Sequence, residues 1–206
     1  MKTSAIILAG GFSKRFGRDK GLIELNGKPL ILHVLNKVAS VVNEIVVVVS
    51  SRTQKERLQG ALAHRVSVVV DKQEVQSPLI GAVTGFDHAQ GEYSLLLPCD
   101  TPFLSSSVAQ LLLELCTKKA AVIPKWANGY VEPLQAAYHT ESALRSARIV
   151  LKEGKRNLRS MIAHLNGVRY ISTTVLKAWD PELLTFFNVN TADDLRKAEA
   201  ILSKCC

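Results

Sequence analysis

Short apolar runs alternate with stretches of helical periodicity over the first 125 residues of the chain. The runs are rich in β-branched side chains and too short for buried helices, which favours strands. We expect strands at residues 5–9, 45–49, 66–70, 94–97 and 120–123, and helices at 30–42, 53–63 and 79–88 and after a cap at Ser105 or Ser106. Strands that alternate with helices form parallel βαβ units with right-handed crossovers. The pattern therefore predicts an α/β fold: a doubly wound, mostly parallel sheet with helices on both faces.

The pattern after residue 125 is less regular, although no linker separates it from the rest. We expect extended structure at residues 129–138, helices at 141–152 and 158–164, a strand at 169–173 and a final helix. Thr191 and Asp194 have the spacing of a capping box, which indicates where that helix begins. At 206 residues, the chain is predicted to form a single domain, 1–206, with halves at roughly 1–125 and 126–206.

Composition narrows the class of protein. The apolar runs fall far short of the ~20 residues of a membrane span, and no secretory signal begins the chain, so we expect a cytoplasmic protein without a membrane partner. The net charge of +8 favours an anionic partner, but only 6% of residues are aromatic, which disfavours nucleic acid. Cys99, Cys116, Cys205 and Cys206 form no C-x-x-C pair and are expected to be free thiols, and the histidine spacing disfavours zinc.

The first apolar run ends abruptly at Gly10-Gly11, and a strongly basic segment follows. Glycines let the backbone turn sharply and let a ligand approach the amide groups. Lys14, Arg15, Arg18 and Lys20 then place cationic side chains close together along the chain. This order predicts a loop that wraps a polyphosphate, with Arg15 and Lys20 neutralising its charge. The alternative is a hairpin with a solvated basic face.

Carboxylates follow two other predicted strands, and ligands of doubly wound sheets bind where the strands end. Asp100 is the best-placed ligand for Mg²⁺, which takes carboxylate, phosphate and water oxygens. Its alternative role is an Asx turn or a helix cap. Asp71 is expected to accept hydrogen bonds from a base or a ribose, unless it only forms a turn. Cys99 has no identifiable base beside it, so we expect a small buried side chain and not a nucleophile.

The segment from Leu8 to Lys20 decides which kind of glycine loop this is. Neither G-x-x-x-x-G-K-[ST] nor G-x-G-x-x-G occurs, which disfavours P-loop NTPases and dinucleotide-binding proteins. The segment reads L-A-G-G-x-S-x-R-F-G-x-D-K and resembles the signature loop of nucleotidyltransferases, above all of the molybdenum cofactor guanylyltransferase (MobA-type) family. Three later segments resemble further motifs of that family: C-D-x-P-F-L at residues 99–104, E-P-L at 132–134 and F-x-N-[IV]-N-T-x-x-D-L around 187–195.

The resemblance implies a Mg²⁺-dependent enzyme with a Rossmann-like nucleotidyltransferase fold. It implies transfer of GMP from GTP to the terminal phosphate of molybdenum–molybdopterin, with release of pyrophosphate. The first half would bind the nucleotide and the second half the acceptor. The implied catalytic residues are Arg15, Lys20 and Asp100; the nucleotide-binding residues are Leu8, Ala9, Gly10, Gly11, Lys20, Asp71 and Asp100; the acceptor-binding residues are Glu132, Asn188 and Asn190. Molybdoenzymes and other proteins of cofactor biosynthesis are further candidate partners.

One departure from the family pattern leaves the choice of base open. The family's G-P-L-x-G segment begins with Ser77 here and lies near the base pocket in the family. A cytidylyltransferase for the same acceptor and a sugar-phosphate nucleotidyltransferase are therefore alternatives. A non-catalytic carrier of the cofactor is an alternative from another class, against which the presence of Lys20 and Asp100 argues. A basic zone from Arg145 to Arg159 is a candidate surface for the acceptor, with a solvated helical face as the alternative.

Overall fold

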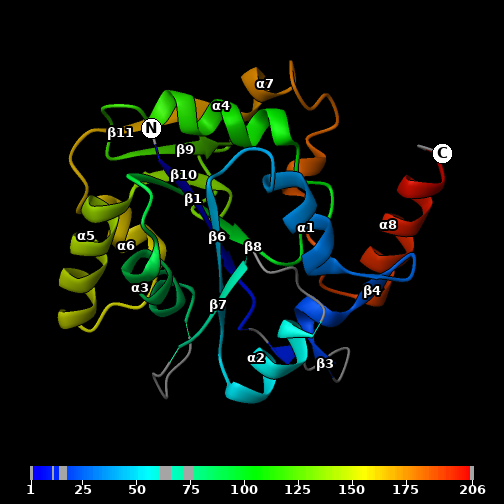
Figure 1. Cartoon of the computed structure of the whole chain (residues 1–206). Helices are drawn as coiled ribbons and strands as arrows, with labels where there is room; N and C mark the ends of the chain where they lie inside the picture. Colours follow the sequence, from blue (N-terminus) through cyan, green and yellow to red (C-terminus); the bar gives the residue numbers. More distant parts are fainter. Residues whose placement is uncertain (1, 11, 14–17, 61–65, 72–76, 205–206) are drawn as a thin grey trace.

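A computed structural model describes residues 2–10, 12–13, 18–60, 66–71 and 77–204 of the chain, with only the backbone of 12, 13 and 18. The strands of its main sheet are β1 (Thr3–Leu8), β6 (Glu44–Val49), β7 (Val66–Val70), β8 (Tyr93–Pro98), β9 (Ala121–Lys125), β10 (Ala136–His139) and β11 (Val168–Ser172). They lie in the order β11-β9-β10-β8-β1-β6-β7 (Figure 1). Within the described sheet, only β10 pairs antiparallel, with β8 and β9. The predicted mostly parallel α/β fold is confirmed.

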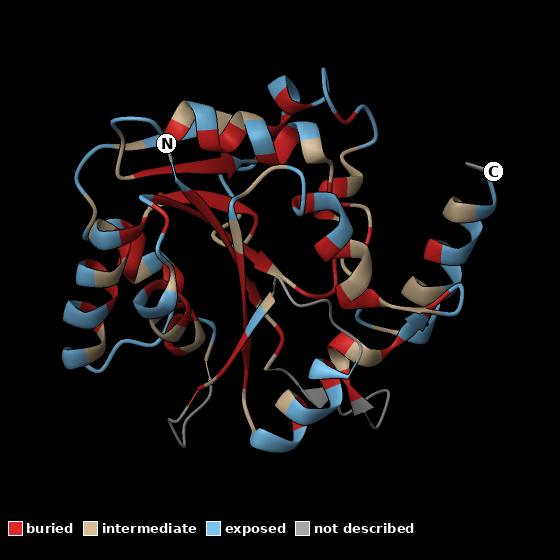
Figure 2. Ribbon diagram, in the orientation of Figure 1, coloured by how far each residue is buried: buried red, intermediate tan, exposed pale blue. Residues whose placement is uncertain are grey.

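Helices cover both faces of this sheet, and its central strands β1, β6 and β8 are almost wholly buried between them (Figure 2). One face carries α1 (Leu30–Val38), α2 (Arg52–Gln59) and α4 (Ser106–Cys116), and the other carries α3 (Pro78–His88), α5 (Thr140–Lys152) and α6 (Leu158–Ala163). Two short helices, α7 (Thr173–Leu176) and the 3₁₀ turn η2 (Leu184–Phe186), lead to the last helix, α8 (Ala192–Lys204).

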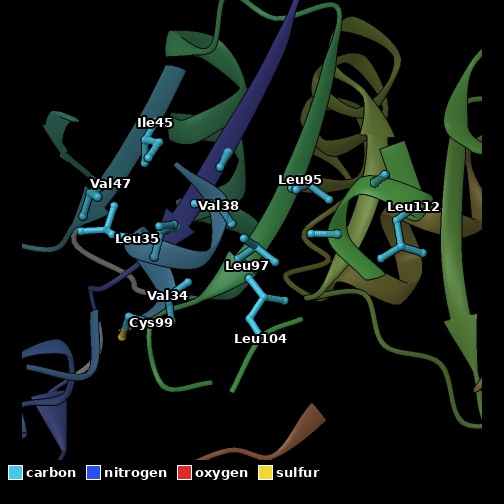
Figure 3. Packing of buried hydrophobic residues seen from close by; sticks show 14 of the residues in the cluster. Val34, Leu35, Val38, Ile45, Val47, Leu95, Leu97, Cys99, Leu104 and Leu112 are labelled. Atoms are coloured by element: carbon cyan, nitrogen blue, oxygen red, sulfur yellow. The ribbon is translucent and has the colours of Figure 1, made fainter. Parts of the chain in front are cut away.

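The two faces of β1 supply two separate cores because successive side chains of a strand point to opposite sides. Ala5 and Ile7 join the cluster under α1 and α4, where Leu35 and Val38 of α1 pack over the sheet (Figure 3). Ile6 joins the cluster under α3, α5 and α6. A central strand that is apolar on both faces therefore fixes the three layers of the fold.

Helix α3 approaches the sheet at Gly85. A Cβ built on Gly85 would lie 2.2 Å from Cγ2 of Ile6 and 3.3 Å from Cγ2 of Val48. No side chain fits in that space without a shift, so the glycine sets the distance between α3 and strands β1 and β6. The amino end of the same helix faces the carboxyl edge of the sheet, where the candidate site lies.

A third, smaller core joins the early part of the chain to its last helix. Strands β4 (Glu24–Leu25) and β5 (Lys28–Pro29) form a hairpin, and Asn26 and Gly27 turn it with φ of 51° and 72°. An Asn-Gly pair with positive φ at both residues is typical of a tight hairpin turn. The buried members of this small core are Ile23, Leu25 and Leu30 from the hairpin region and Val189 and Ala198 from the C-terminal segment.

The structure corrects several predicted boundaries. Helix α1 ends at Val38 and not at residue 42, although Val41 and Val42 still pack against the core. Pro29 ends β5, and α1 begins directly after it at Leu30, where the helix was predicted to begin. Extended structure predicted at 129–138 is a strand only over Ala136–His139. None of the described helices is both long enough and apolar enough to cross a membrane.

Candidate functional site

A pocket of about 290 Å³ lies at the carboxyl edge of the sheet, where β1, β6, β7 and β8 end. It has an apolar wall and a polar end. The lining residues are Leu8, Gly10, Lys20, Val48, Ser50, Asp71, Ser77, Pro78, Gly81, Pro98, Cys99, Asp100 and Leu134. Gly10, Asp71 and Asp100, which follow three different strands, thus border a single cavity, as expected for parallel strands that end at one edge.

Asp100 lies at the polar end of the pocket and is almost fully buried, at 4% exposure. Its Oδ2 forms an ion pair with Nζ of Lys20, which also donates a hydrogen bond to Oδ1 of Asn190 at 2.6 Å. The backbone of Asp100 accepts a 2.9 Å hydrogen bond from the amide of Val189. Three distant parts of the chain, at residues 20, 100 and 189–190, therefore meet around Asp100.

The other carboxylate oxygen of Asp100, Oδ1, is a candidate ligand for the expected Mg²⁺. Oδ1 is buried and has no hydrogen-bond partner among the described residues. A bare carboxylate oxygen beside a polar pocket is a hard ligand of the kind that Mg²⁺ accepts, with phosphate and water oxygens completing the shell. The described residues contain no group of three His, Cys, Asp or Glu that could hold a metal ion by themselves. Asp100 thus fits a cation that is shared with a phosphate ligand.

Asp71 and Ser77 lie at the opposite end of the pocket from the Asp100 junction along the sheet edge, since β7 is the outermost strand. The backbone amide of Asp71 donates to the carbonyl of Val49 at 2.7 Å, and Oγ1 of Thr84 donates to Oδ1 of Asp71 at 3.3 Å. Ser77 caps α3, its Oγ accepting from the amide of Ile80 at 3.3 Å. Both side chains are therefore held by α3 and its start.

Of the predicted residues in the first strand and its loop, Leu8 and Gly10 line the pocket, whereas Ala9 is buried and bonds to β6 through its amide, 2.8 Å from the carbonyl of Val48. A Cβ on Gly10 would lie 3.2 Å from the backbone nitrogen of Ser50, so the glycine lets β1 end against β6. Gly11 and Arg15 lie outside the described residues, and their predicted roles stay predictions.

The three predicted acceptor-binding residues lie in two places: Asn188 and Asn190 in the C-terminal segment, and Glu132 beside Trp126. Asn190 contacts Lys20, as described above, and the Nδ2 of Asn188 donates to the carbonyl of Phe186 at 3.1 Å. Glu132 does not line the pocket: its Oε1 accepts from Nε1 of Trp126 at 2.7 Å. Burial raises the pKa of Glu132, while the bond from Trp126 and the charge of Arg159 oppose that shift. Leu134, two residues later, is the part of this segment that reaches the pocket wall.

The basic zone is largely occupied by contacts of its own. Arg145 pairs with Glu141 at 2.7 Å, Arg148 with Asp87 at 2.5 Å and Lys155 with Glu153 at 2.7 Å. The basic residues of these exposed pairs lie on α5 and the turn after it, Asp87 lies on α3, and none of these residues lines the pocket. Arg159 differs, because its guanidinium lies 5.0 Å from the ring centroid of Tyr130. The contacts favour a solvated helical face over most of the zone.

Two buried glutamines that carry contacts around the pocket were missed from the sequence. Gln54 of α2 links Ser50 at the pocket wall to Asp19, the residue before Lys20. Gln135, with φ of 73°, holds the carbonyl of Thr185 at 2.6 Å and so anchors the C-terminal segment to β10. Glutamine is usually exposed, and a single sequence gives no signal that either side chain would be buried.

The sheet order and a pocket at the strand ends define an α/β protein of the nucleotide-binding, doubly wound class. A sequence profile of the MobA-like NTP transferase domain matches residues 5–168. The chain belongs to this family of nucleotidyltransferases.

Individual relatives extend the match over nearly the full chain. A "Probable molybdenum cofactor guanylyltransferase" of Pyrococcus horikoshii is 36% identical over 200 residues, which is 95% of this chain and 98% of the relative. One from Bacillus cereus ATCC 10987 is 32% identical over 205 residues and 98% of both chains. The crystal structure of molybdopterin-guanine dinucleotide biosynthesis protein A from Archaeoglobus fulgidus superposes with a TM-score of 0.84 at 30% identity, covering 98% of this chain and 99% of that one.

Proposed function

We propose that this nucleotidyltransferase transfers GMP from GTP to the terminal phosphate of molybdenum–molybdopterin, forming the guanine dinucleotide cofactor and releasing pyrophosphate. Family membership and the relatives named above support the reaction. The observation that carries it in this structure is the junction at Asp100. There a lysine and a buried carboxylate with one bare oxygen line a pocket, and the lysine also contacts Asn190 of the C-terminal segment.

The reaction is a displacement at the α-phosphorus of GTP. An oxygen of the acceptor phosphate forms a new bond to that phosphorus, and the bond from it to the oxygen that bridges to the β-phosphate breaks. A phosphomonoester is already ionised near neutral pH, since its second pKa is about 6, so the protein does not have to remove a proton. Catalysis then depends on positioning two anions and neutralising the charge that develops between them.

The described residues are suited to that task. Lys20 is partly exposed, with 24% of its side chain accessible, and can bind phosphate oxygens from its place in the pocket. Asp100 would hold Mg²⁺ through its bare oxygen, and the ion would supply further positive charge beside the phosphates. We assign Leu8 and Gly10 to the nucleotide and Asp71 to its ribose or base, and Asn188 and Asn190 to the acceptor side.

We place the reaction in the cytoplasm, where thiols stay reduced, because the described cysteines Cys99 and Cys116 are unpaired. Delivery of the product to molybdoenzymes or to other biosynthetic proteins stays a prediction.

Glu132 already accepts a hydrogen bond from Trp126, so of the three predicted acceptor-binding residues it has the least support.

The test combines nucleotide choice with the loss of one carboxylate. With Mg²⁺ present at saturating nucleotide, about 100 times Kd, GTP should stabilise the protein by about 2.7 kcal/mol, which raises Tm by roughly 5–10 °C, and CTP, ATP and UTP should do less. Asp100→Asn should lower pyrophosphate release with GTP and acceptor by at least about a hundredfold.

Asp87→Asn is the matched control, because Asp87 is also an ion-paired aspartate but lies outside the pocket, on α3. It should keep wild-type release. A larger Tm shift with CTP would replace the guanylyltransferase by a cytidylyltransferase, and full pyrophosphate release by Asp100→Asn would refute the assigned site. Binding of GTP without any release in the presence of acceptor would favour the carrier alternative.

A further inference from the structure

Helix α2 buries a polar side chain where a surface helix normally buries an apolar one. Its sequence, RTQKERLQ, offers Leu58 as its one buried apolar residue, and the position one turn earlier on the same face is Gln54 at 5% exposure. A buried amide is unfavourable unless its oxygen and nitrogen are hydrogen bonded. The reason for its presence must lie in its partners.

Those partners belong to the pocket wall and to the residue that precedes Lys20. Oε1 of Gln54 accepts from the amide of Ser50 at 2.9 Å and from Oγ of Ser50 at 2.7 Å, and Ser50 lines the pocket wall at the end of β6. Nε2 of Gln54 donates to Oδ1 of Asp19 at 2.7 Å. Asp19 is 7% exposed and directly precedes Lys20 in the chain.

The remaining oxygen of Asp19 is also held from α2. NH1 of Arg57 lies 3.2 Å from Oδ2 of Asp19, one helical turn beyond Gln54. The Arg57 side chain is 61% exposed, so this ion pair contributes little in water, whereas the Gln54 contact is buried. Among the contacts of the described residues, the buried amide is therefore the stronger of the two links between α2 and Asp19.

We propose that Gln54 is a positioning residue that fixes Asp19, and through it Lys20, against the wall of the nucleotide pocket formed by Ser50. This inference rests on the proposed function for its catalytic meaning. Lys20 has to reach both Asp100 and incoming phosphates, so a shift of its backbone would misplace charge at the reacting centre. This relay, the chain of hydrogen bonds from Ser50 through Gln54 to Asp19, would join the pocket wall at Ser50 to the segment that carries Lys20.

A reversal of the hydrogen bond tests the relay. Gln54→Glu keeps the shape and keeps an acceptor for Ser50, but it places a second carboxylate oxygen against Oδ1 of Asp19, and like charges at this distance repel. Adding Asp19→Asn restores a donor–acceptor pair with its direction reversed. Gln110→Glu on the exposed face of α4 is the matched control, because Gln110 donates to Glu114 at 2.8 Å in the same way and does not line the pocket.

The first readout needs no activity. In ligand-free protein, Gln54→Glu should speed amide hydrogen exchange in a peptide covering residues 18–22 by about tenfold, and the Asp19→Asn/Gln54→Glu pair should return it to the rate of Asp19→Asn alone. The second readout is kcat/KM for GMP transfer, which should fall about tenfold in Gln54→Glu. In the Asp19→Asn/Gln54→Glu double variant it should recover to within about threefold of the value for Asp19→Asn alone. Gln110→Glu should change neither.

Unchanged exchange and unchanged kcat/KM in Gln54→Glu would overturn the relay, and so would a double variant no better than Gln54→Glu. If Gln54→Glu does not fold, Gln54→Met replaces it, and Asp19→Asn should then add no further loss, whereas additive losses would count against the link. Wild-type protein without transfer activity would refute the proposed function, and the exchange data would then decide the relay by themselves.

Discussion

At the scale of single residues, burial makes the thiol of Cys99 unreactive, although Cys99 directly precedes Asp100 at the end of β8. Cys99 is 3% exposed, and its Sγ would lie 3.7 Å from a Cβ built on Gly21, so it packs under the segment that carries Lys20. Burial, together with the charge of Asp100, raises the pKa of the Cys99 thiol to about 12. Near neutral pH the thiol is protonated, and it is not a nucleophile.

Cys99→Ala should therefore keep GMP transfer within about threefold of wild type, because only packing is lost. The measurement is kcat/KM for pyrophosphate release, compared with Asp100→Asn under the same conditions. Iodoacetamide at pH 8 should alkylate Cys99 only after unfolding, which peptide mapping detects. A loss in Cys99→Ala as large as that in Asp100→Asn would assign the thiol a role in the reaction.

The sequence predicted those residues whose place follows from strand order. Gly10, Asp71 and Asp100 follow apolar runs, and the ends of parallel strands share an edge, so their meeting could be expected. The contact of Lys20 with Asn190 could not, because it spans 170 positions and depends on how the C-terminal segment packs. Gln54 was missed because a polar helix does not reveal which polar residue it buries.

At the scale of elements, the layer spacing between α3 and the sheet depends on Gly85. Gly85→Ala should lower the free energy of unfolding by about 1–3 kcal/mol, because its methyl group would overlap Ile6. Denaturant unfolding measures the change. Gly60→Ala is the matched control. Gly60 follows α2 with φ of −66°, and a Cβ there would make only an ordinary contact among the described residues, 3.9 Å from the carbonyl oxygen of Arg57, so alanine should be neutral or stabilise by up to about 1 kcal/mol. Equal effects of the two substitutions would contradict the packing argument.

Elements were predictable where a local pattern determines them and not where tertiary contacts do. The β-branched run of β7 was predicted to the residue, at 66–70. The end of α1 was missed because Val41 and Val42 remain half-buried beyond the helix and prolong the apolar spacing. The turn η2 gave no signal, because it depends on Asp180, whose carboxylate accepts from the amide of Thr185 at 2.7 Å.

At the scale of the whole molecule, α8 lies apart from the three layers and packs on the hairpin of β4 and β5 (Figure 1). Ala198 is its one fully buried residue among those described. Directly before the helix, Val189 and Asn190 hold Asp100 and Lys20. The small core thus fixes the C-terminal edge of the pocket, and the division of the chain into nucleotide and acceptor halves stays a prediction.

Ala198→Glu should detach α8, because it buries a charge in the small core, and should lower the free energy of unfolding by at least about 2 kcal/mol. It should also weaken GTP binding about tenfold, although Ala198 does not line the pocket. Ala200→Glu, on the exposed side of the same helix, should stay within about 0.5 kcal/mol of wild type. Unfolding curves and GTP titration measure both. Unaltered GTP affinity in a destabilised Ala198→Glu protein would separate α8 from the site.

The small core also has a consequence for biosynthesis on the ribosome. Ile23, Leu25 and Leu30 leave the exit tunnel early, while Val189 and Ala198, which cover them, are synthesised some 160 residues later. At 5–20 residues per second, the nascent chain carries these apolar side chains uncovered for roughly ten to thirty seconds. The backbone carbonyl of Asp100, whose side chain lies at the polar end of the pocket, acquires its partner Val189 in the same late step. A growing chain therefore cannot complete its nucleotide site before this final segment has emerged.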